Sequence, residues 1–292
     1  MSRGRWGTGK RWVLAGVATA ASTVLMGSSP GAASAAPAAP VHPPVSLPGD
    51  GHLSPNVGAS SGIARGRTAP TANSLDWAGY AVTGPIVTSV SGSWDQPAVA
   101  CSGRKAQQSA FWVGIDGYAA SDPTVQQVGT DSDCTKGSKK HPGGAVYYAW
   151  FEMYPASLVV LPPASYPVTS GDVLSASVSG TGVDYVLSIS DAGRWSFTTN
   201  EIAAPVPLAA SAEWIAEAPT ACTAGRCKAQ PLADFGSVAF HGATVNNGAV
   251  NAPGQTDTQI TMSKNKKGTI VKAATTALDP TGRDFTVTWL QN

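Results

Sequence analysis

Four short stretches of the sequence set acidic or amide side chains among aromatic residues, in the alternating pattern of β-strands. They are residues 111–117, 125–129, 147–155 and 212–217. Polar groups on an aromatic sheet surface lose water and need partners, so such strands are costly to build. A carboxyl group in this setting can act first as a base and then as an acid. A neighbouring amide can accept a hydrogen bond from water and donate one to an oxyanion.

The stretch 147–154 separates into two faces, because side chains alternate along a strand. The even-numbered residues place three aromatic rings around one carboxylate, and they are Tyr148, Trp150, Glu152 and Tyr154. The odd-numbered residues, from Tyr147 to Met153, favour the core. The even-numbered face is therefore either the wall of a groove or a solvated face on which a Tyr hydroxyl caps Glu152.

The stretch 211–217 places two carboxylates, Glu213 and Glu217, on one face of a predicted strand. Trp214 and Ala216 lie on the other face. One carboxylate can be the active acid or base, and the other a structural partner.

Other catalytic patterns are absent or misplaced. Gly-x-Ser-x-Gly occurs at 27–31 and 58–62, in segments that we expect to be removed, and neither match joins a strand to a helix. His141 lies in a Lys-rich turn, and His241 follows an apolar strand with no serine motif nearby. No HExxH zinc motif and no phosphate-binding glycine-rich loop occurs, so we expect neither a metal nor a cofactor.

The N-terminal part of the chain has the features of an export signal. Four basic residues precede the uncharged stretch 12–26, and Ala33-Ser34-Ala35 gives the pattern of a signal-peptidase site. We predict a signal peptide at 1–35, with an uncleaved anchor as the alternative, and a secreted, extracellular protein that is not attached to the membrane after cleavage. Residues 36–72 are rich in Pro, Ala, Gly and Ser, and are either a propeptide or a flexible linker.

The remaining residues, 73–292, suit one all-β domain. Strand-like runs recur with turn residues between them, such as the hairpin signal Ser179–Gly182, and almost no segment has a helical period. About a dozen strands in one domain predict an antiparallel sandwich of two sheets. The polar stretch 246–268 is hard to place in this pattern.

The charge balance argues against nucleic acid as a partner. The first 35 residues carry four of the 19 Lys and Arg and none of the 18 Asp and Glu, so the formal charge of +1 becomes −3 in the rest of the chain. No basic patch is interleaved with aromatic residues. We expect a monomer.

Four cysteines in a secreted chain predict two disulfides. Cys222 and Cys227 enclose only four residues, which suits a local bridge. Cys101 would then pair with Cys134. Neither pair has the spacing of a zinc site with a nearby His.

Five motifs occur in the order seen in the glutamic peptidases, or eqolisins, which this chain therefore resembles. They are DWAG at 76–79, WVGIDG at 112–117, VQQVG at 125–129, AWFEMYP at 149–155 and AEWIAE at 212–217. The resemblance covers about residues 73–245, and the part after Val245 matches poorly. It implies a secreted, acid-acting, pepstatin-insensitive endopeptidase that is made with a propeptide, acts on polypeptides and folds as a lectin-like jelly-roll sandwich.

The same resemblance implies roles for single residues. The catalytic pair falls on Gln127 and Glu217, and not on Gln126 or Glu213. The residues that match the substrate groove and its support are Trp77, Trp112, Asp116, Trp150 and Glu152.

Two other functions fit a sandwich with aromatic residues on one face. A carbohydrate-binding module would use the same rings. A glycosidase would use Glu152 and Glu217 as a carboxylate pair. Neither has a special need for Gln127 at its position, so this residue discriminates between the three functions.

We predict that the active, secreted protein begins well after Ala36, between about Gly62 and Ser74. The export signal implies one cut, and the Pro-rich segment, which cannot form a core of its own, implies a second. N-terminal sequencing of the active protein is the measurement. Full activity of a form that starts at residue 36 would show that no propeptide is removed.

Overall fold

The structure is a computed structural model that describes residues 70–292, apart from 102–104, 120, 142, 224–225 and 266. Nothing is described for the side chains of 222–227. The predicted signal peptide and nearly all of the predicted propeptide lie outside the described residues.

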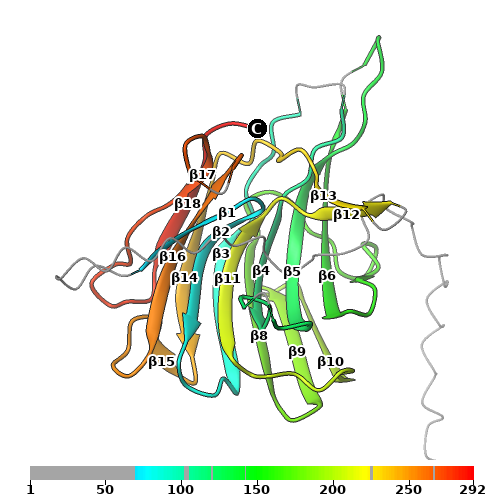
Figure 1. Ribbon diagram of the computed structural model, residues 1–292. Helices are drawn as coiled ribbons and strands as arrows, with labels where there is room; N and C mark the ends of the chain where they lie inside the picture. Colours follow the sequence, from blue (N-terminus) through cyan, green and yellow to red (C-terminus); the bar gives the residue numbers. More distant parts are fainter. Residues whose placement is uncertain (1–69, 102–104, 120, 142, 224–225, 266) are drawn as a thin grey trace, which may run out of the picture. The chain divides into compact units, whose positions relative to one another are not determined.

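Every element in the described part of the chain is a β-strand (Figure 1). The strands are β1 (Thr71–Ser74), β2 (Trp77–Thr83), β3 (Ser89–Asp95), β4 (Ala110–Ile115), β5 (Val125–Cys134), β6 (Ala145–Tyr154), β7 (Val159–Val160), β8 (Val173–Thr181), β9 (Asp184–Asp191), β10 (Trp195–Ile202), β11 (Ser211–Glu217), β12 (Thr220–Thr223), β13 (Arg226–Ala229), β14 (Ser237–Val245), β15 (Gly248–Ala249), β16 (Thr256–Ser263), β17 (Val271–Thr275) and β18 (Phe285–Trp289). No helix in this part of the chain is long and apolar enough to cross a membrane.

Sixteen strands form one hydrogen-bonded sheet, and fourteen of them follow a single path that folds over into two packed layers. The order is β10-β9-β8-β3-β14-β18-β17-β16-β2-β11-β4-β5-β6-β7, with β1 beside β16 and β15 beside β14. The strands from β10 to β18 form one layer and those from β16 to β7 the other, and β17 joins the two. In Figure 1 the joined side lies at the left, and β6 and β10 lie at the right. The strands β12 and β13 pair as a separate hairpin.

The hydrophobic core lies between the two layers. Two buried indole groups cross it and tie the layers together: Trp214 Nε1 donates to the backbone oxygen of Ser91 over 2.8 Å, and Trp94 Nε1 donates to Thr130 Oγ1 over 3.0 Å. An indole N–H in a core needs such a partner. The predicted all-β antiparallel sandwich is confirmed.

The strand predictions succeed where hydrophobic alternation is strong and fail where polar residues hide it. The strands β4 and β11 have the predicted ends. The stretch 246–268 proves to hold β15 and β16. Only Ile260 and Met262 give β16 a recognisable apolar side, although the strand lies at the joint between the layers.

The predicted start of the domain at residue 73 falls inside a strand. Residues 71–74 pair in parallel with β16, and Ala72 is buried. A mature chain that began after Ser74 would lack this strand.

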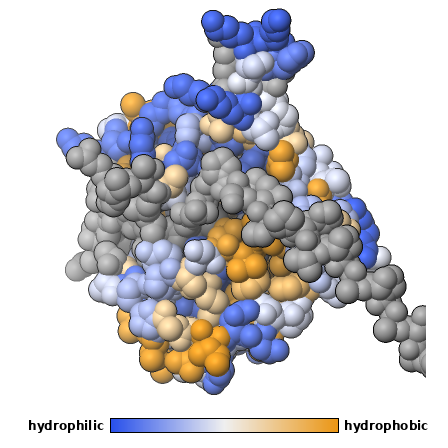
Figure 2. Space-filling model, turned by 90° about the vertical axis from the view of Figure 1, so that its right-hand side faces the viewer, coloured by the Kyte–Doolittle hydropathy of each residue, from blue (hydrophilic) through white to orange (hydrophobic). Residues whose placement is uncertain are grey.

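Figure 2 shows the side of the molecule that lies at the right in Figure 1. Hydrophobic side chains gather at its centre and lower edge, with hydrophilic ones around them. Exposed aliphatic residues of β7, β9 and β10 include Val159, Val186 and Ile202. This is the open side of the sandwich, where the two ends of the sheet path lie.

The predicted Cys101–Cys134 disulfide is confirmed. It ties the segment after β3 to the end of β5, with 5.3 Å between the two Cα atoms. The backbones of Cys222 and Cys227 face each other across the β12–β13 hairpin, as a local bridge requires. Their side chains lie outside the described residues, so that bridge stays a prediction.

Replacing both Cys101 and Cys134 with Ser should lower the free energy of unfolding by about 3–4 kcal/mol. The reason is that the two cysteines are 33 residues apart, and the unfolded chain regains the entropy of that loop. Denaturant unfolding of the wild type and the double variant measures the difference. A loss below about 1 kcal/mol would contradict the prediction.

Candidate active site

The outer face of β2, β11, β4, β5 and β6 carries the residues predicted for the site, and we call it the site face. Strand register arranges its side chains in three rows. The first row is Trp77, Glu217, Ala110, Asp131 and Tyr148. The second is Gly79, Ile215, Trp112, Gly129 and Trp150, and the third is Ala81, Glu213, Gly114, Gln127 and Glu152. The apolar members form a cluster separate from the sandwich core.

The predicted faces of β6 are confirmed. Ala149, Phe151 and Met153 belong to the core, while Tyr148 and Trp150 belong to the site face. The alternative of a solvated face around Glu152 is wrong, because this carboxylate is only 1% exposed.

Trp112 forms the floor of the site face. Glycines leave room for its ring: a Cβ on Gly114 would lie 2.9 Å from Trp112 Cζ3, and a Cβ on Gly129 would lie 2.6 Å from Trp112 Cβ. The ring packs edge-on against Trp77, with 4.9 Å between centroids. Its Nε1 donates to Glu217 Oε2 over 2.8 Å. Trp112 therefore fixes the orientation of the Glu217 carboxyl.

The Gln127 amide is fixed in a similar way. Its Nε2 donates to Glu152 Oε2 over 2.6 Å, and both residues are buried. Gln127 Oε1 has no hydrogen-bond partner among the described residues. Glu152 therefore orients the amide so that its carbonyl oxygen can accept a further hydrogen bond.

Gln127 and Glu217 lie on the same face of the sheet. They lie on either side of Trp112. Glu217 on β11 pairs with Ala110 of β4, and Gln127 on β5 pairs with Gly114 of β4. On an untwisted sheet this register places their Cα atoms about 16 Å apart. Only a molecule lying over the Trp112 ring could contact both groups. Catalytic hydrogen bonds are often long or missing without substrate.

Gln126 points to the opposite face of β5. It is fully buried between the layers, and neither side-chain polar atom has a partner among the described residues. The choice of Gln127 over Gln126 therefore agrees with the side of the sheet that carries Glu217.

Glu213 is the second carboxyl of β11 on the site face. It is fully buried, and neither oxygen has a hydrogen bond of normal length in the described part of the chain. Burial raises the pKa of Glu213 well above its usual value, and the charges of Asp116 and Asp122 raise it further. The Ser211 hydroxyl nearby lowers it only in part. Glu213 is therefore held in its neutral form at acid pH.

Asp116 serves the backbone rather than the groove. It follows β4 with a positive φ of 73°, and its two oxygens accept from the amides of Ala209 and Ala210 over 2.8 and 2.6 Å. These bonds hold the segment that leads into β11. Burial is the main cause that raises the pKa of Asp116, to about 6. The structure thus favours a positioning role over direct contact with substrate.

Sequence analysis missed Asp131, which lies in the row of Glu217. Trp150 Nε1 donates to Asp131 Oδ1 over 2.6 Å, and the Tyr148 hydroxyl donates to Asp131 Oδ2 over 2.8 Å. The signal was present, since a period of two from Gln127 reaches residue 131 on the same face.

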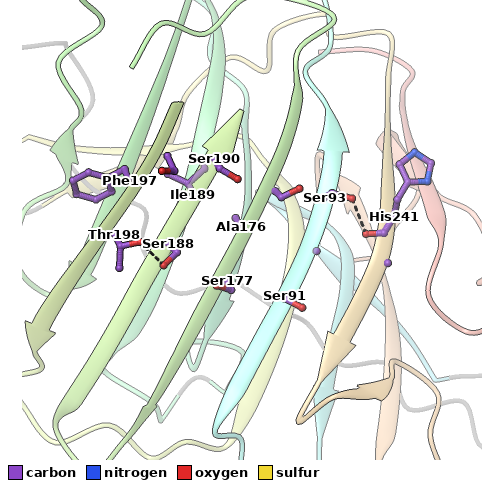
Figure 3. Close-up of a pocket in the computed structure, with 14 residues that line it drawn as sticks. Ser91, Ser93, Ala176, Ser177, Ser188, Ile189, Ser190, Phe197, Thr198 and His241 are labelled. Atoms are coloured by element: carbon purple, nitrogen blue, oxygen red, sulfur yellow. Dashed lines mark hydrogen bonds between the residues drawn. The ribbon is translucent and has the colours of Figure 1, made fainter. Parts of the chain in front are cut away.

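A hollow away from the site face does not add catalytic groups. It lies on the outer surface of β3, β8, β9, β10 and β14 and is lined mainly by serines (Figure 3). Ser93 Oγ donates to the backbone oxygen of His241, and the imidazole points away from that hydroxyl in Figure 3. His241 Nδ1 lies 3.3 Å from Asp284 Oδ2. Because Ser93 does not contact the imidazole, these residues do not form a Ser–His–Asp triad.

The sequence profile of the Peptidase A4 family matches residues 75–289, which include every residue of the site face. The chain belongs to this family. The predicted resemblance to the glutamic peptidases is therefore confirmed, and with it the interpretation of the chain as a peptide hydrolase.

Two solved structures share the fold of this Peptidase A4 member. Scytalido-glutamic peptidase with a transition-state analog inhibitor has a TM-score of 0.61 and 18% identity, over 74% of this chain and 98% of that one. SCP-B, an eqolisin in complex with the tripeptide Ala-Ile-His, has a TM-score of 0.56 and 18% identity, over the same shares of the two chains. No curated protein sequence is significantly similar to this chain.

The buried carboxyls should make the folded protein more stable in acid. Glu213 and Asp116 bind protons more tightly in the folded state, because burial raises the pKa of both carboxyls. Their stabilising effect is full below about pH 4, and it is lost as pH rises through each raised pKa, which is about 6 for Asp116. Asp279 has a lowered pKa because backbone amides donate to it. Its contribution to stability is lost as pH falls, but only below about pH 4, so it does not affect the range from about pH 4 to 7.

We therefore expect the melting temperature to fall as pH is raised from about 4 to 7, and Glu213→Gln to flatten this dependence. Circular dichroism melts of both proteins across this range are the measurement. A wild type that becomes more stable toward pH 7 would disprove the expectation.

Proposed function

We propose that this Peptidase A4 member is a secreted, acid-acting endopeptidase in which Glu217 activates water and Gln127 stabilises the oxyanion. The observation that carries the proposal is the pair of fixed polar groups on either side of Trp112. One is a carboxyl held by an indole N–H, and the other is an amide held by a carboxylate.

Glu217 is the group proposed to move protons. It takes one proton from a water molecule as the water oxygen attacks the peptide carbonyl carbon, and it returns that proton to the leaving nitrogen when the C–N bond breaks. The bond from Trp112 to Oε2 keeps the carboxyl in one orientation during both steps. No covalent intermediate is needed.

Gln127 is the group proposed to stabilise the developing charge. One N–H of its amide is used by Glu152, so the second N–H can donate to the oxyanion while the carbonyl oxygen accepts from the attacking water. The amide does not titrate at working pH, so it can do this throughout the acid range.

A polypeptide substrate would lie over the Trp112 ring, since only there can one molecule reach both groups. Trp77 and Trp150 would flank it. These indoles are almost fully buried in the structure, and Tyr118, Leu158 and other partly buried residues pack against them.

The register argues against a glycosidase that pairs Glu152 with Glu217. Three strands and four residues separate them, which is about 20 Å between Cα atoms on an untwisted sheet. Glycosidase carboxyl groups lie about 5–9.5 Å apart. A carbohydrate-binding module, for its part, gives no reason to fix the Gln127 amide beside Glu152.

Glu217→Gln should abolish peptidase activity without unfolding the chain, because it removes the proposed proton carrier. Gln127→Ala should reduce the rate by ~10²–10³, the usual cost of losing one oxyanion donor. The measurement is the initial rate on an unstructured protein at acid pH, with circular dichroism as a test of folding.

Gln126→Ala is the matched control for Gln127→Ala, since it removes the same side chain from the other face of β5. Its effect on the rate should be mild, and Glu213→Gln should be milder than Glu217→Gln. Near-normal activity of folded Glu217→Gln would refute the proposed mechanism. An active Gln127→Ala beside inactive Glu152→Gln and Glu217→Gln would favour a carboxylate pair.

Digestion of casein or haemoglobin should be faster at pH 3 than at pH 7 and should persist with pepstatin present, because the proposed mechanism uses Glu217 and Gln127 and not two catalytic aspartates. These two pH values are roughly one unit below and three units above the usual pKa of a carboxyl group. Complete inhibition by pepstatin, or a faster reaction at neutral pH, would contradict the proposal.

A further inference from the structure

Two carboxyl groups of β5 meet at one hydroxyl on the edge of the site face. Asp131 and Asp133 are two residues apart on a strand, so their side chains lie on the same face. The Tyr148 hydroxyl lies 2.8 Å from Asp131 Oδ2 and 3.1 Å from Asp133 Oδ2. All three residues are at least nine-tenths buried.

The Tyr148 hydroxyl has too few hydrogens to bond both carboxyl groups, so one carboxyl must carry a proton. A tyrosine hydroxyl has one hydrogen and can donate to only one of two carboxylates. Burial and the charges of Asp131 and Asp133 raise the pKa of Tyr148, so it keeps that hydrogen. The second contact is favourable only when the other carboxyl carries a proton and donates to the hydroxyl oxygen.

Asp133 is the carboxyl that carries this proton. Burial raises the pKa of Asp133 well above its usual value, and the charge of Asp131 raises it further. Gln108 Nε2 and the Ser109 amide also donate to Asp133, over 3.4 and 3.2 Å, but neither supplies a positive charge. Like charges this close cannot both ionise easily.

The other ionisable groups near the cluster are few in the described part of the chain. Tyr148 faces it from β6, and β4 contributes the apolar Ala110 at this position. Glu217 of β11 lies in the same row as Asp131, beyond Ala110. The segment before β4 contributes only the uncharged Gln108 and Ser109.

The cluster ends on a wall of the proposed groove. Asp131 Oδ1 accepts from Trp150 Nε1 over 2.6 Å, so a chain of hydrogen bonds runs from Asp133 through Tyr148 and Asp131 to the Trp150 ring. The disulfide at Cys134 anchors the strand end beside Asp133.

We propose that Asp133, Tyr148 and Asp131 share one proton that holds Trp150 in place, and that loss of this proton sets the upper pH limit of the peptidase. When Asp133 releases its proton to solvent, two carboxylates face one hydroxyl hydrogen and the hydrogen-bond chain breaks. Asp133 is in this sense a positioning residue, which acts on the groove through Asp131 and Trp150.

The first test follows the indole N–H resonance of Trp150, assigned with Trp150→Phe, by ¹H–¹⁵N NMR from about pH 3 to 8. The wild-type resonance should titrate. Asp133→Asn should abolish the titration, because the Asn amide donates to Tyr148 at every pH. Asp95→Asn, which changes an exposed carboxyl of β3, should titrate like the wild type. A wild-type resonance that does not move, or an Asp133→Asn variant that titrates like the wild type, would overturn the proposal.

The second test is the pH profile of kcat/KM, and it alone rests on the proposed function. Asp133→Asn should keep the acid plateau and move the falling upper limb to higher pH. If this limb moves up by one pH unit, the kcat/KM of the variant is about ten times that of the wild type at a pH where both fall. An unchanged limb would show that the cluster does not set the limit.

Two further outcomes are distinguishable. If Asp133→Asn does not fold, Tyr148→Phe replaces it in the NMR test, and its Trp150 resonance should no longer titrate. If the wild type shows no peptidase activity, the proposed function is refuted, but the NMR test of the cluster can still be carried out.

Discussion

The site face depends on buried carboxyl groups that accept hydrogen bonds from indole, amide and hydroxyl donors. Trp112 donates to Glu217, Gln127 donates to Glu152, and Trp150 and a tyrosine donate to Asp131. A neutral donor stabilises a buried carboxylate less than a cation does, so protonation remains accessible.

The same constraint explains the aromatic composition of the face. An indole ring supplies a hydrogen-bond donor at its edge and a large apolar surface beside it, so one residue both covers a carboxyl and satisfies it. Such rings need space within the sheet. The glycines at 114 and 129 provide it, because a Cβ at either position would press on Trp112. The tryptophans of the motifs therefore bind the carboxyl groups, and the glycines leave room for the tryptophan rings.

Much of this could be predicted from sequence, because alternation is strong where the sheet separates an apolar core from a polar site. The faces of β6 and β11 and the side of Gln127 follow from a period of two. The structure of β16 could not be predicted, since its polar residues conceal the apolar side and its partners include the distant β1 and β2. The contact between Gln127 and Glu152 needs the register of β5 on β6, which the long connection between these strands does not reveal. The role of Asp131 rests on its contacts with Trp150 and Tyr148, which likewise need the register of β5 on β6.

The position of β18 has a consequence for the order of folding. This strand ends at Trp289, yet it pairs with β14 and β17 in the middle of the sheet path, and β17 is the only link between the layers along that path. β2 and β3 are neighbours in sequence but lie in different layers. Pairings so distant in sequence form slowly, because long loops must close first. The two layers can therefore be joined only after nearly the whole chain has been made, so the N-terminal strands must wait for the C-terminal ones before the sandwich closes.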